Sequence, residues 1–200
     1  MKPSLPINEY FLSVQGEGVN SGRLALFLRF GKCNLNCSFC DTRPALTQYR
    51  NMSPAKIQKV LKQYKHSTRF IVLTGGEPLL HDLTPLIKIL KRESFTIAVE
   101  TNGTLYKNWL QQVDWITVSP KPGSTIIGKT LETASELKFV ITRTSDLKFA
   151  EQFMPFSPAF LMPANNKKKL ADMIFAYLKK SPYAGHLKLG FQMQKVFQLQ

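Results

Sequence analysis

Cys33, Cys37 and Cys40 lie within one short segment, and they are all the cysteines that the 200-residue chain contains. Thiolates at the spacing C-x3-C-x2-C suit an iron–sulfur cluster. A cluster of four irons has four metal corners, so three protein ligands leave one iron open to a substrate or cofactor, whereas a fully ligated cluster can only pass electrons. The spacing therefore predicts a cluster that takes part in chemistry.

Other uses of three cysteines explain the segment less well. A disulfide framework needs an even number of cysteines. A structural zinc site usually has four N or S ligands, and His66, His81 and His186 do not lie at the spacing such a site requires. A non-catalytic electron carrier or cluster-based sensor would be expected to ligate all four irons and to have a smaller core. Inert core cysteines would have no reason to cluster.

The chain is strongly basic, with 27 Lys and Arg against 13 Asp and Glu, a net charge of +14. Such a balance suits nucleic acid, an anionic substrate or an acidic electron donor. Because no nucleic-acid motif accompanies the charge, direct nucleic-acid binding is not expected. Neither a signal peptide nor a run of roughly 18 apolar residues is present, so we expect a cytoplasmic protein without membrane contact.

Short apolar runs alternate with helical patterns along the sequence. Runs of this length suit strands that are covered on both faces, and their alternation with helices implies parallel strands with right-handed crossovers. The expected strands span residues 23–30, 70–73, 96–99, 115–118, 137–141 and 159–162, with a possible edge strand at 187–192. Six such units are fewer than the eight of a closed barrel. We therefore predict one α/β domain over residues 1–200, folded as an open, partial parallel β/α barrel of about six strands.

Four helices are expected between these strands. Ser53 and Pro54 are typical of a helix N-terminus, and an apolar face with helical spacing follows them. Asp82 is expected to cap a helix over 83–92, and Ser145 one that ends near residue 153. Residues 170–178 repeat the helical spacing.

The unusual polar residues follow the expected strands. In parallel α/β folds the carboxyl ends of the strands form the functional site. The segments that follow the successive strands are the cysteine segment, 74–78, 100–103, 119–121 and 162–165. We therefore expect these segments to surround one site next to the cluster.

The cysteine segment and the later Gly75-Gly76-Glu77-Pro78 together resemble the radical S-adenosylmethionine (SAM) superfamily. The resemblance implies that the methionine part of SAM chelates the open iron. It also implies that an electron from the reduced cluster cleaves SAM to a 5′-deoxyadenosyl radical, which abstracts hydrogen from the substrate. The glycine-rich stretch would pass close to the methionine amino group, where a Cβ would obstruct the backbone.

A narrower resemblance spans nearly the whole chain and points to the 7-carboxy-7-deazaguanine synthase family. The motifs that carry it are Pro6-Ile7-Asn8-Glu9, Val14-Gln15-Gly16-Glu17-Gly18, Phe27-Leu28-Arg29, Cys40-Asp41-Thr42, Thr74-Gly75-Gly76-Glu77-Pro78, Glu100-Thr101-Asn102-Gly103 and Val118-Ser119-Pro120-Lys121. This family makes a step toward 7-deazaguanine nucleosides such as queuosine. The resemblance implies a magnesium-dependent ring contraction of 6-carboxy-5,6,7,8-tetrahydropterin with loss of ammonia.

The resemblance also implies the site residues. Cys33, Cys37 and Cys40 would ligate a 4Fe–4S cluster, and Thr42 would bind Mg²⁺ through its hydroxyl oxygen. The residues implied to contact the pterin are Val14, Gln15, Gly16, Arg29 and Thr74, with Arg29 pairing with the carboxylate. Those implied to contact SAM are Gly76, Glu77, Ser119, Pro120, Lys121, Met162 and Pro163. A homodimer and an electron donor such as an acidic flavodoxin would be the partners.

The sequence departs from the family pattern at three places. Met162 precedes Pro163 where the family often has Gln, and Gln194 stands where a histidine is expected. The chain also lacks the terminal proline that some members present to the substrate. A rival reading is a glycyl-radical enzyme activase, which shares the cysteine spacing and the size but not the motifs at residues 14–18 and 40–42.

Overall fold

A mixed β-sheet forms the frame of the computed structural model, which describes residues 4–156 and 158–199. Over these residues the sheet has nine strands in the order β3-β1-β2-β4-β5-β6-β7-β8-β9. The strands are β1 (Leu5–Val14), β2 (Leu24–Phe30), β3 (Arg50–Met52), β4 (Phe70–Gly75), β5 (Thr96–Thr101), β6 (Trp115–Val118), β7 (Glu136–Ile141), β8 (Ala159–Pro163) and β9 (Leu187–Leu189).

The strands from β2 to β9 pair in parallel, as the alternating pattern predicts. This run contains the six expected strands and the possible edge strand, and the open sheet agrees with a partial barrel. Strands β1 and β3 were not predicted; β1 pairs antiparallel with β2, and β3 antiparallel with β1. β1 is hard to identify because several of its side chains are only partly buried, and β3 has only three residues.

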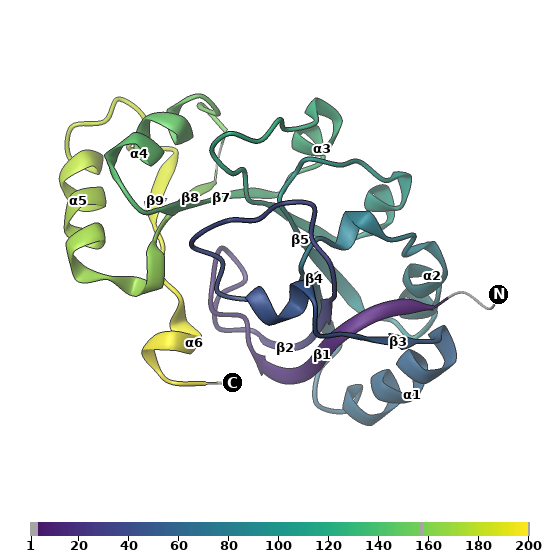
Figure 1. Cartoon of the computed structure of the whole chain (residues 1–200). Helices are drawn as coiled ribbons and strands as arrows, with labels where there is room; N and C mark the ends of the chain where they lie inside the picture. Colours follow the sequence, from purple (N-terminus) through teal and green to yellow (C-terminus); the bar gives the residue numbers. More distant parts are fainter. Residues whose placement is uncertain (1–3, 157, 200) are drawn as a thin grey trace.

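Helices line the outer side of the curved sheet, and the blue segment that carries the cysteines crosses its inner side (Figure 1). Helix α2 packs against β5, α4 against β7, and α5 against β8 and β9. The α-helices are α1 (Pro54–Tyr64), α2 (Thr84–Arg92), α3 (Gly128–Glu132), α4 (Thr144–Glu151), α5 (Lys168–Leu178) and α6 (Met193–Val196). The short 3₁₀ helices are η1 (Arg43–Leu46), η2 (Pro78–Leu80), η3 (Asn108–Gln112) and η4 (Ala164–Asn166).

The predicted N-terminal capping residue is confirmed for α1, while the predictions for α2 and α4 need correction. The Ser53 hydroxyl accepts a hydrogen bond from the Lys56 amide, as expected for α1. Helix α2 begins at Thr84, whose amide donates to Asp82 at 3.0 Å. The expectation that Ser145 caps α4 is wrong, because Asp146 accepts from the amides of Thr142 and Arg143 and the helix begins at Thr144.

The two faces of the sheet bury different residues. Alternate residues of a strand point to opposite faces. The outer face carries Leu26, Leu28, Ile71, Leu73, Ile97 and Val99, which join the main core beneath the helices. The inner face carries a smaller apolar cluster, which consists of Ala25, Phe27, Phe70, Val72 and Ala98. Inner-face positions beyond this cluster, toward the carboxyl ends of the strands, are therefore free to carry polar groups.

The loop between β1 and β2 reaches across the inner face to β7. The Val19 amide donates to the buried Glu136 carboxylate at 2.8 Å, and the Glu17 carboxylate pairs with Lys138 of the same strand. A side chain in place of Gly18 would collide with Glu136, and Gly18 has a positive φ of 69°, so glycine is required here. These contacts therefore link the loop between β1 and β2 to β7 across the inner face.

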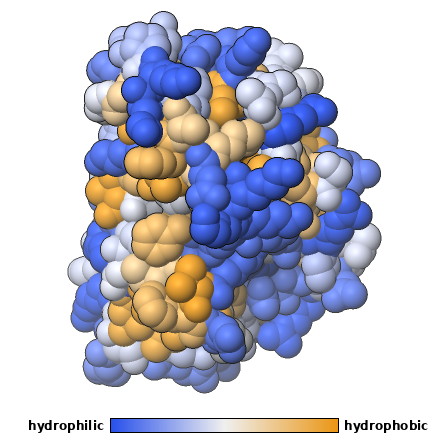
Figure 2. All heavy atoms as spheres, turned by 90° about the vertical axis from the view of Figure 1, so that its left-hand side faces the viewer, coloured by the Kyte–Doolittle hydropathy of each residue, from blue (hydrophilic) through white to orange (hydrophobic). Residues whose placement is uncertain are grey.

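The face at the left of Figure 1, where α5, β9 and α6 lie, exposes apolar side chains among hydrophilic ones (Figure 2). Phe175, Phe191, Val196 and Phe197 are all exposed on these segments. Among the described helices, none combines the length and the apolar character needed to cross a bilayer.

Candidate active site

A row of polar residues crosses the inner face of the sheet. Strand register places Arg29 beside Thr74, Glu100 beside Thr117, and Thr117 beside Glu136. Arg29 lies two residues beyond Phe27 of the apolar inner-face cluster. Thr74 and Glu100 lie two residues beyond Val72 and Ala98 of the same cluster. Because two residues is the period of a strand, the polar groups lie on the same face as that apolar cluster and toward the carboxyl ends.

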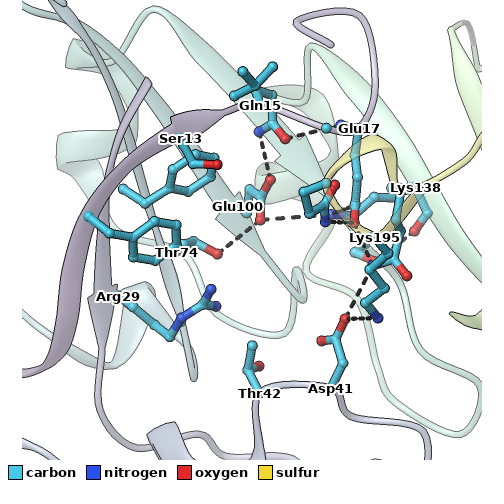
Figure 3. Close-up of a pocket in the computed structure, with 18 of the residues that line it drawn as sticks. Ser13, Gln15, Glu17, Arg29, Asp41, Thr42, Thr74, Glu100, Lys138 and Lys195 are labelled. Atoms are coloured by element: carbon cyan, nitrogen blue, oxygen red, sulfur yellow. Dashed lines mark hydrogen bonds and ion pairs between the residues drawn. The ribbon is translucent and has the colours of Figure 1, made fainter. Parts of the chain in front are cut away.

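This row borders a cavity of about 430 Å³. All five residues expected to contact the pterin line it, namely Val14, Gln15, Gly16, Arg29 and Thr74. Figure 3 shows Gln15, Thr74 and Arg29 around the Glu100 carboxylate, with Thr42 and Asp41 on another side of the cavity. The structure thus brings together residues from the N-terminal hairpin, the cysteine segment and the parallel strands.

Glu100 is the centre of a hydrogen-bond network in the cavity. One carboxylate oxygen accepts from the Gln15 side-chain amide at 3.0 Å, and the other accepts from the Thr74 hydroxyl at 2.9 Å. Burial opposes ionisation of Glu100, but Lys138 and these hydrogen bonds lower its pKa below the usual value. The cavity therefore presents an ionised carboxylate.

A second carboxylate, Glu17, lies beside the first. Lys138 Nζ is 2.6 Å from Glu17 and 3.7 Å from Glu100, and all three side chains are largely buried. The Glu17 side chain also accepts from Gln192 at 2.8 Å.

The cysteines occupy the segment between β2 and η1. All three are half-buried, and the Leu35 amide donates to Cys33 Sγ at 3.4 Å. Burial raises the pKa of Cys33, and the neighbouring Cys37 and Cys40 raise it further, so the three thiols share one electrostatic environment. Thiol donors on one partly exposed loop fit an iron–sulfur cluster chemically. No three His, Cys, Asp or Glu side chains of the described residues converge as a metal site, so ligation stays a prediction.

Thr42 lies at the junction of the cysteine segment and the cavity. Its hydroxyl is 3.6 Å from Cys40 Sγ, and its side chain lines the cavity. Asp41, next to it, pairs with Lys195 at 2.8 Å and accepts from Gln192 at 3.1 Å. Burial acts against ionisation of Asp41, but these two partners lower its pKa. Threonine and aspartate oxygens at this edge are ligands of the kind that Mg²⁺ prefers.

Gly76 runs against the start of the cysteine segment. Its amide donates to Phe30 O at 2.9 Å, and a Cβ at this position would lie 1.8 Å from Lys32 O. Gly76 lines the cavity, and its contact with SAM stays a prediction. Its neighbour Glu77 is fully buried and accepts from the Thr101 hydroxyl and the Asn102 amide, both at 2.8 Å. Glu77 therefore joins two strand-end loops and does not line the cavity.

The remaining expected SAM residues are divided between two places. Ser119 and Lys121 line the main cavity, and burial together with the neighbouring Lys138 lowers the pKa of Lys121 to about 8. Met162 and Pro163 line a small adjacent hollow, which shares Glu17 and Asp41 with the main cavity. Pro120 is buried and lines neither of them.

The C-terminal segment covers the cavity from residues 192 to 199. The Met193 amide donates to Gly16 O at 3.0 Å, and Gln194, Lys195 and Leu199 join the cavity wall. A Cβ on Gly16 would lie 1.7 Å from the Gln194 side-chain oxygen, so glycine permits this close packing. That oxygen is buried and has no hydrogen-bond partner among the described residues.

Sequence reasoning assigned no role to several cavity residues, although four of them, Glu17, Asp41, Glu100 and Asn102, lie within the motifs quoted above. The others are Lys138, Gln192, Lys195 and Leu199. The two-residue strand period, counted on from Ala98, would have indicated Glu100. The family resemblance pointed to the C-terminal segment through Gln194, but only the tertiary fold shows that the segment packs on Gly16.

Comparisons with known proteins agree with this geometry. The sequence profile of the Radical SAM superfamily matches residues 28–142. The chain is similar to 7-carboxy-7-deazaguanine synthase from Synechocystis, with 35% identity over 88% of this chain and 85% of that protein. The protein of the same name from Bacteroides thetaiotaomicron is 36% identical over 80% of this chain and 78% of its own length. The crystal structure of QueE from Escherichia coli matches with a TM-score of 0.79 and 27% identity, over 95% of this chain and 94% of that one.

Proposed function

Because the chain belongs to the radical SAM superfamily and, within it, to the 7-carboxy-7-deazaguanine synthase family, we propose that it converts 6-carboxy-5,6,7,8-tetrahydropterin to 7-carboxy-7-deazaguanine with release of ammonia. The observation that supports this reaction most is the cavity beside the cysteine segment, which all five expected pterin-contacting residues line. Its volume of about 430 Å³ suits a small heterocycle. It also combines a guanidinium that can bind a carboxylate with carboxylates that can accept from ring N–H groups.

Membership of the superfamily implies a 4Fe–4S cluster and SAM as cofactors. When bound, they supply the 5′-deoxyadenosyl radical that removes a hydrogen atom from the substrate. Cys33, Cys37 and Cys40 would hold the cluster. The main-chain atoms of Gly76 would contact SAM, as would Ser119, Pro120, Lys121, Met162 and Pro163. The part of Glu77 would be indirect, through the Asn102 loop that it holds.

The protein supplies position and a controlled environment for this chemistry. Arg29 would pair with the pterin carboxylate, while Thr74, Gln15 and the backbone of Val14 and Gly16 would contact the ring. Thr42 would give an oxygen ligand to Mg²⁺, which would orient the substrate carboxylate and stabilise charge. The C-terminal segment would exclude water from the cavity.

Two partners belong to this proposal. The enzyme would act as a homodimer, which light scattering at several protein concentrations would test. Its electron donor would be an acidic protein such as a flavodoxin, because the chain carries a net charge of +14.

The test is an anaerobic assay of the reconstituted protein with dithionite, SAM, Mg²⁺ and 6-carboxy-5,6,7,8-tetrahydropterin, with products identified by mass spectrometry. We expect 7-carboxy-7-deazaguanine, and we expect neither it nor 5′-deoxyadenosine from the Cys33→Ala/Cys37→Ala/Cys40→Ala variant. If the wild type forms 5′-deoxyadenosine in the presence of the pterin but no deazaguanine, the radical chemistry stands and the substrate is wrong. A large protein substrate, as for an activase, would then be tested next.

A further inference from the structure

Lys138 lies between two carboxylates in the cavity, and the sequence motifs give it no role. Its Nζ atom is 2.6 Å from Glu17 and 3.7 Å from Glu100, and only 13% of its side chain is exposed. Figure 3 shows Lys138 and Glu17 on the side of the cavity away from Arg29, with Glu100 between. The ion pairs join β7, β5 and the loop between β1 and β2, so one side chain connects three walls of the site.

We propose that Lys138 is a positioning residue, which holds Glu17 and Glu100 as a pair of hydrogen-bond acceptors for the N–H-rich edge of the substrate heterocycle. This inference rests on the proposed function, since it assigns the orientation of the pterin in the cavity. The carboxylate of the pterin would lie toward Arg29 and Thr42, and its pyrimidine ring toward Glu17 and Glu100.

The charges of the group support this assignment. Two carboxylates and one ammonium leave one negative charge, which favours a ligand that donates hydrogen bonds. Without the ammonium the two carboxylates would repel each other, and burial would favour the protonated form of Glu100. A protonated carboxyl would present a donor where the ring needs an acceptor.

Hydrogen bonding fixes the direction of each carboxylate. Glu100 accepts from Gln15 and Thr74, and Glu17 accepts from Gln192 and Lys138. Each carboxylate oxygen has two lone-pair positions. Both acids line the cavity, so their remaining lone pairs are available to a ligand.

Every charged neighbour acts on this group in a defined direction. Burial disfavours the charge on Lys138, but Glu100, Glu17 and Glu136 together raise its pKa far above the usual value. Arg29 adds to the lowering of the Glu100 pKa, after Lys138 and the hydrogen bonds from Thr74 and Gln15. Lys121 and Lys138 repel each other. Asp41 also lies within range of Lys138, which lowers its pKa, and it pairs with Lys195. Removal of Lys138 would leave Arg29, Lys121 and Lys195 as the cations among the described residues that line the cavity.

The first measurement compares the affinity of the SAM-loaded anaerobic enzyme, without reductant, for two ligands. One is 6-carboxypterin, and the other is 6-carboxylumazine, which has an oxygen in place of the 2-amino group. We expect the wild type to prefer the pterin. Lys138→Met should lose at least about 30-fold in pterin affinity and most of this preference, because removal of one partner of a buried charge pair is costly. Lys138→Arg should restore both in part.

A pH series separates positioning from general loss of structure. Wild-type affinity for the pterin should change little between about pH 5.5 and 7.5, since Glu100 stays ionised. In Lys138→Met the pKa of Glu100 should rise, because Lys138 lowers it more than any other neighbour does, so pterin affinity should increase as the pH increases. The matched control is Lys148→Met, which removes the same charge from an exposed position on α4.

Unchanged pterin affinity, ligand preference and pH profile in Lys138→Met would overturn the inference. If that variant does not fold, Glu100→Gln decides, because it keeps Lys138 and the shape of the site. A pterin preference equal to that of the wild type in Glu100→Gln would then overturn it. If the wild type neither turns over nor binds the pterin, the proposed function itself is wrong and the inference falls with it.

Discussion

Arg29 lies at the cavity wall with one edge of its guanidinium already engaged. Its Nε donates to Glu9 at 2.7 Å, and the ring of Phe11 lies 5.8 Å from the guanidinium carbon. The terminal nitrogens point into the cavity (Figure 3). A guanidinium held in this way can bind a carboxylate without first losing its own side-chain freedom.

Arg29→Ala should raise the KM for the pterin by about 10- to 100-fold and change kcat less, because a hydrogen bond to a charged group contributes about 1.5–3 kcal/mol. Steady-state kinetics with varied pterin would measure this. Glu9→Gln should have a smaller effect, since it keeps the arginine in place. An unchanged KM in Arg29→Ala would remove the proposed contact with the substrate carboxylate.

Thr42→Ala should raise the Mg²⁺ concentration needed for half-maximal turnover, because the variant loses the hydroxyl oxygen expected to bind the ion. Thr42→Ser keeps that oxygen and should respond to Mg²⁺ almost as the wild type does. A magnesium titration of turnover compares the three proteins. The same curve for Thr42→Ala and the wild type would contradict the magnesium assignment.

Residue identity alone indicated much of the site but little of its electrostatics. The motifs led to the residues expected to contact the substrate because the family resemblance assigns roles to those positions. They gave no role to Lys138 or to Asp41, whose ion pairs are with residues far away in the sequence. Charge pairing of this kind is a tertiary property, so no pattern within one segment encodes it.

At the scale of elements, the parallel strands could be predicted from their short apolar runs, because both of their faces are covered. The hairpin strand β1 could not, since its side chains are buried to varying degrees. The cavity depends on both kinds of element. Strands β2, β4, β5 and β7 carry its polar row, and the loop that follows β1 forms another wall.

The contact between the β4 loop and the cysteine segment gives a prediction at this scale. Gly76→Ala should destabilise the protein by about 1–3 kcal/mol and lower its iron content after reconstitution, because the added Cβ meets the main chain at Lys32. Thermal unfolding and iron analysis would measure both. Gly128→Ala is the matched control, since nothing lies within 4 Å of its Cβ position. Equal iron content and stability in Gly76→Ala and the wild type would contradict the prediction.

The whole molecule combines an acidic pair in its cavity with a strongly basic total charge.

The fold class could be predicted from the alternation of strands and helices, because crossover rules leave few alternatives. The way in which the hairpin loop and α6 enclose the cavity could not, because it depends on contacts of that loop with β7 and of α6 with Gly16, which join residues far apart in the sequence.

The net charge of +14 predicts how the enzyme responds to salt. Turnover driven by an acidic flavodoxin should fall several-fold when the salt concentration rises from about 50 to 300 mM, since screening weakens the attraction between unlike charges. Turnover driven by dithionite in excess should change much less. Equal salt sensitivity with both reductants would exclude electrostatic docking of the donor.

The C-terminal segment has a consequence for synthesis of the protein. Phe11 and Leu199 both line the cavity, although they lie near opposite ends of the described chain. A growing polypeptide can therefore complete most of the sheet while it is still attached to the ribosome, yet it cannot enclose a ligand until residues 192–199 have emerged. Competence to bind the proposed substrate would therefore be acquired only when those residues dock on the loop between β1 and β2.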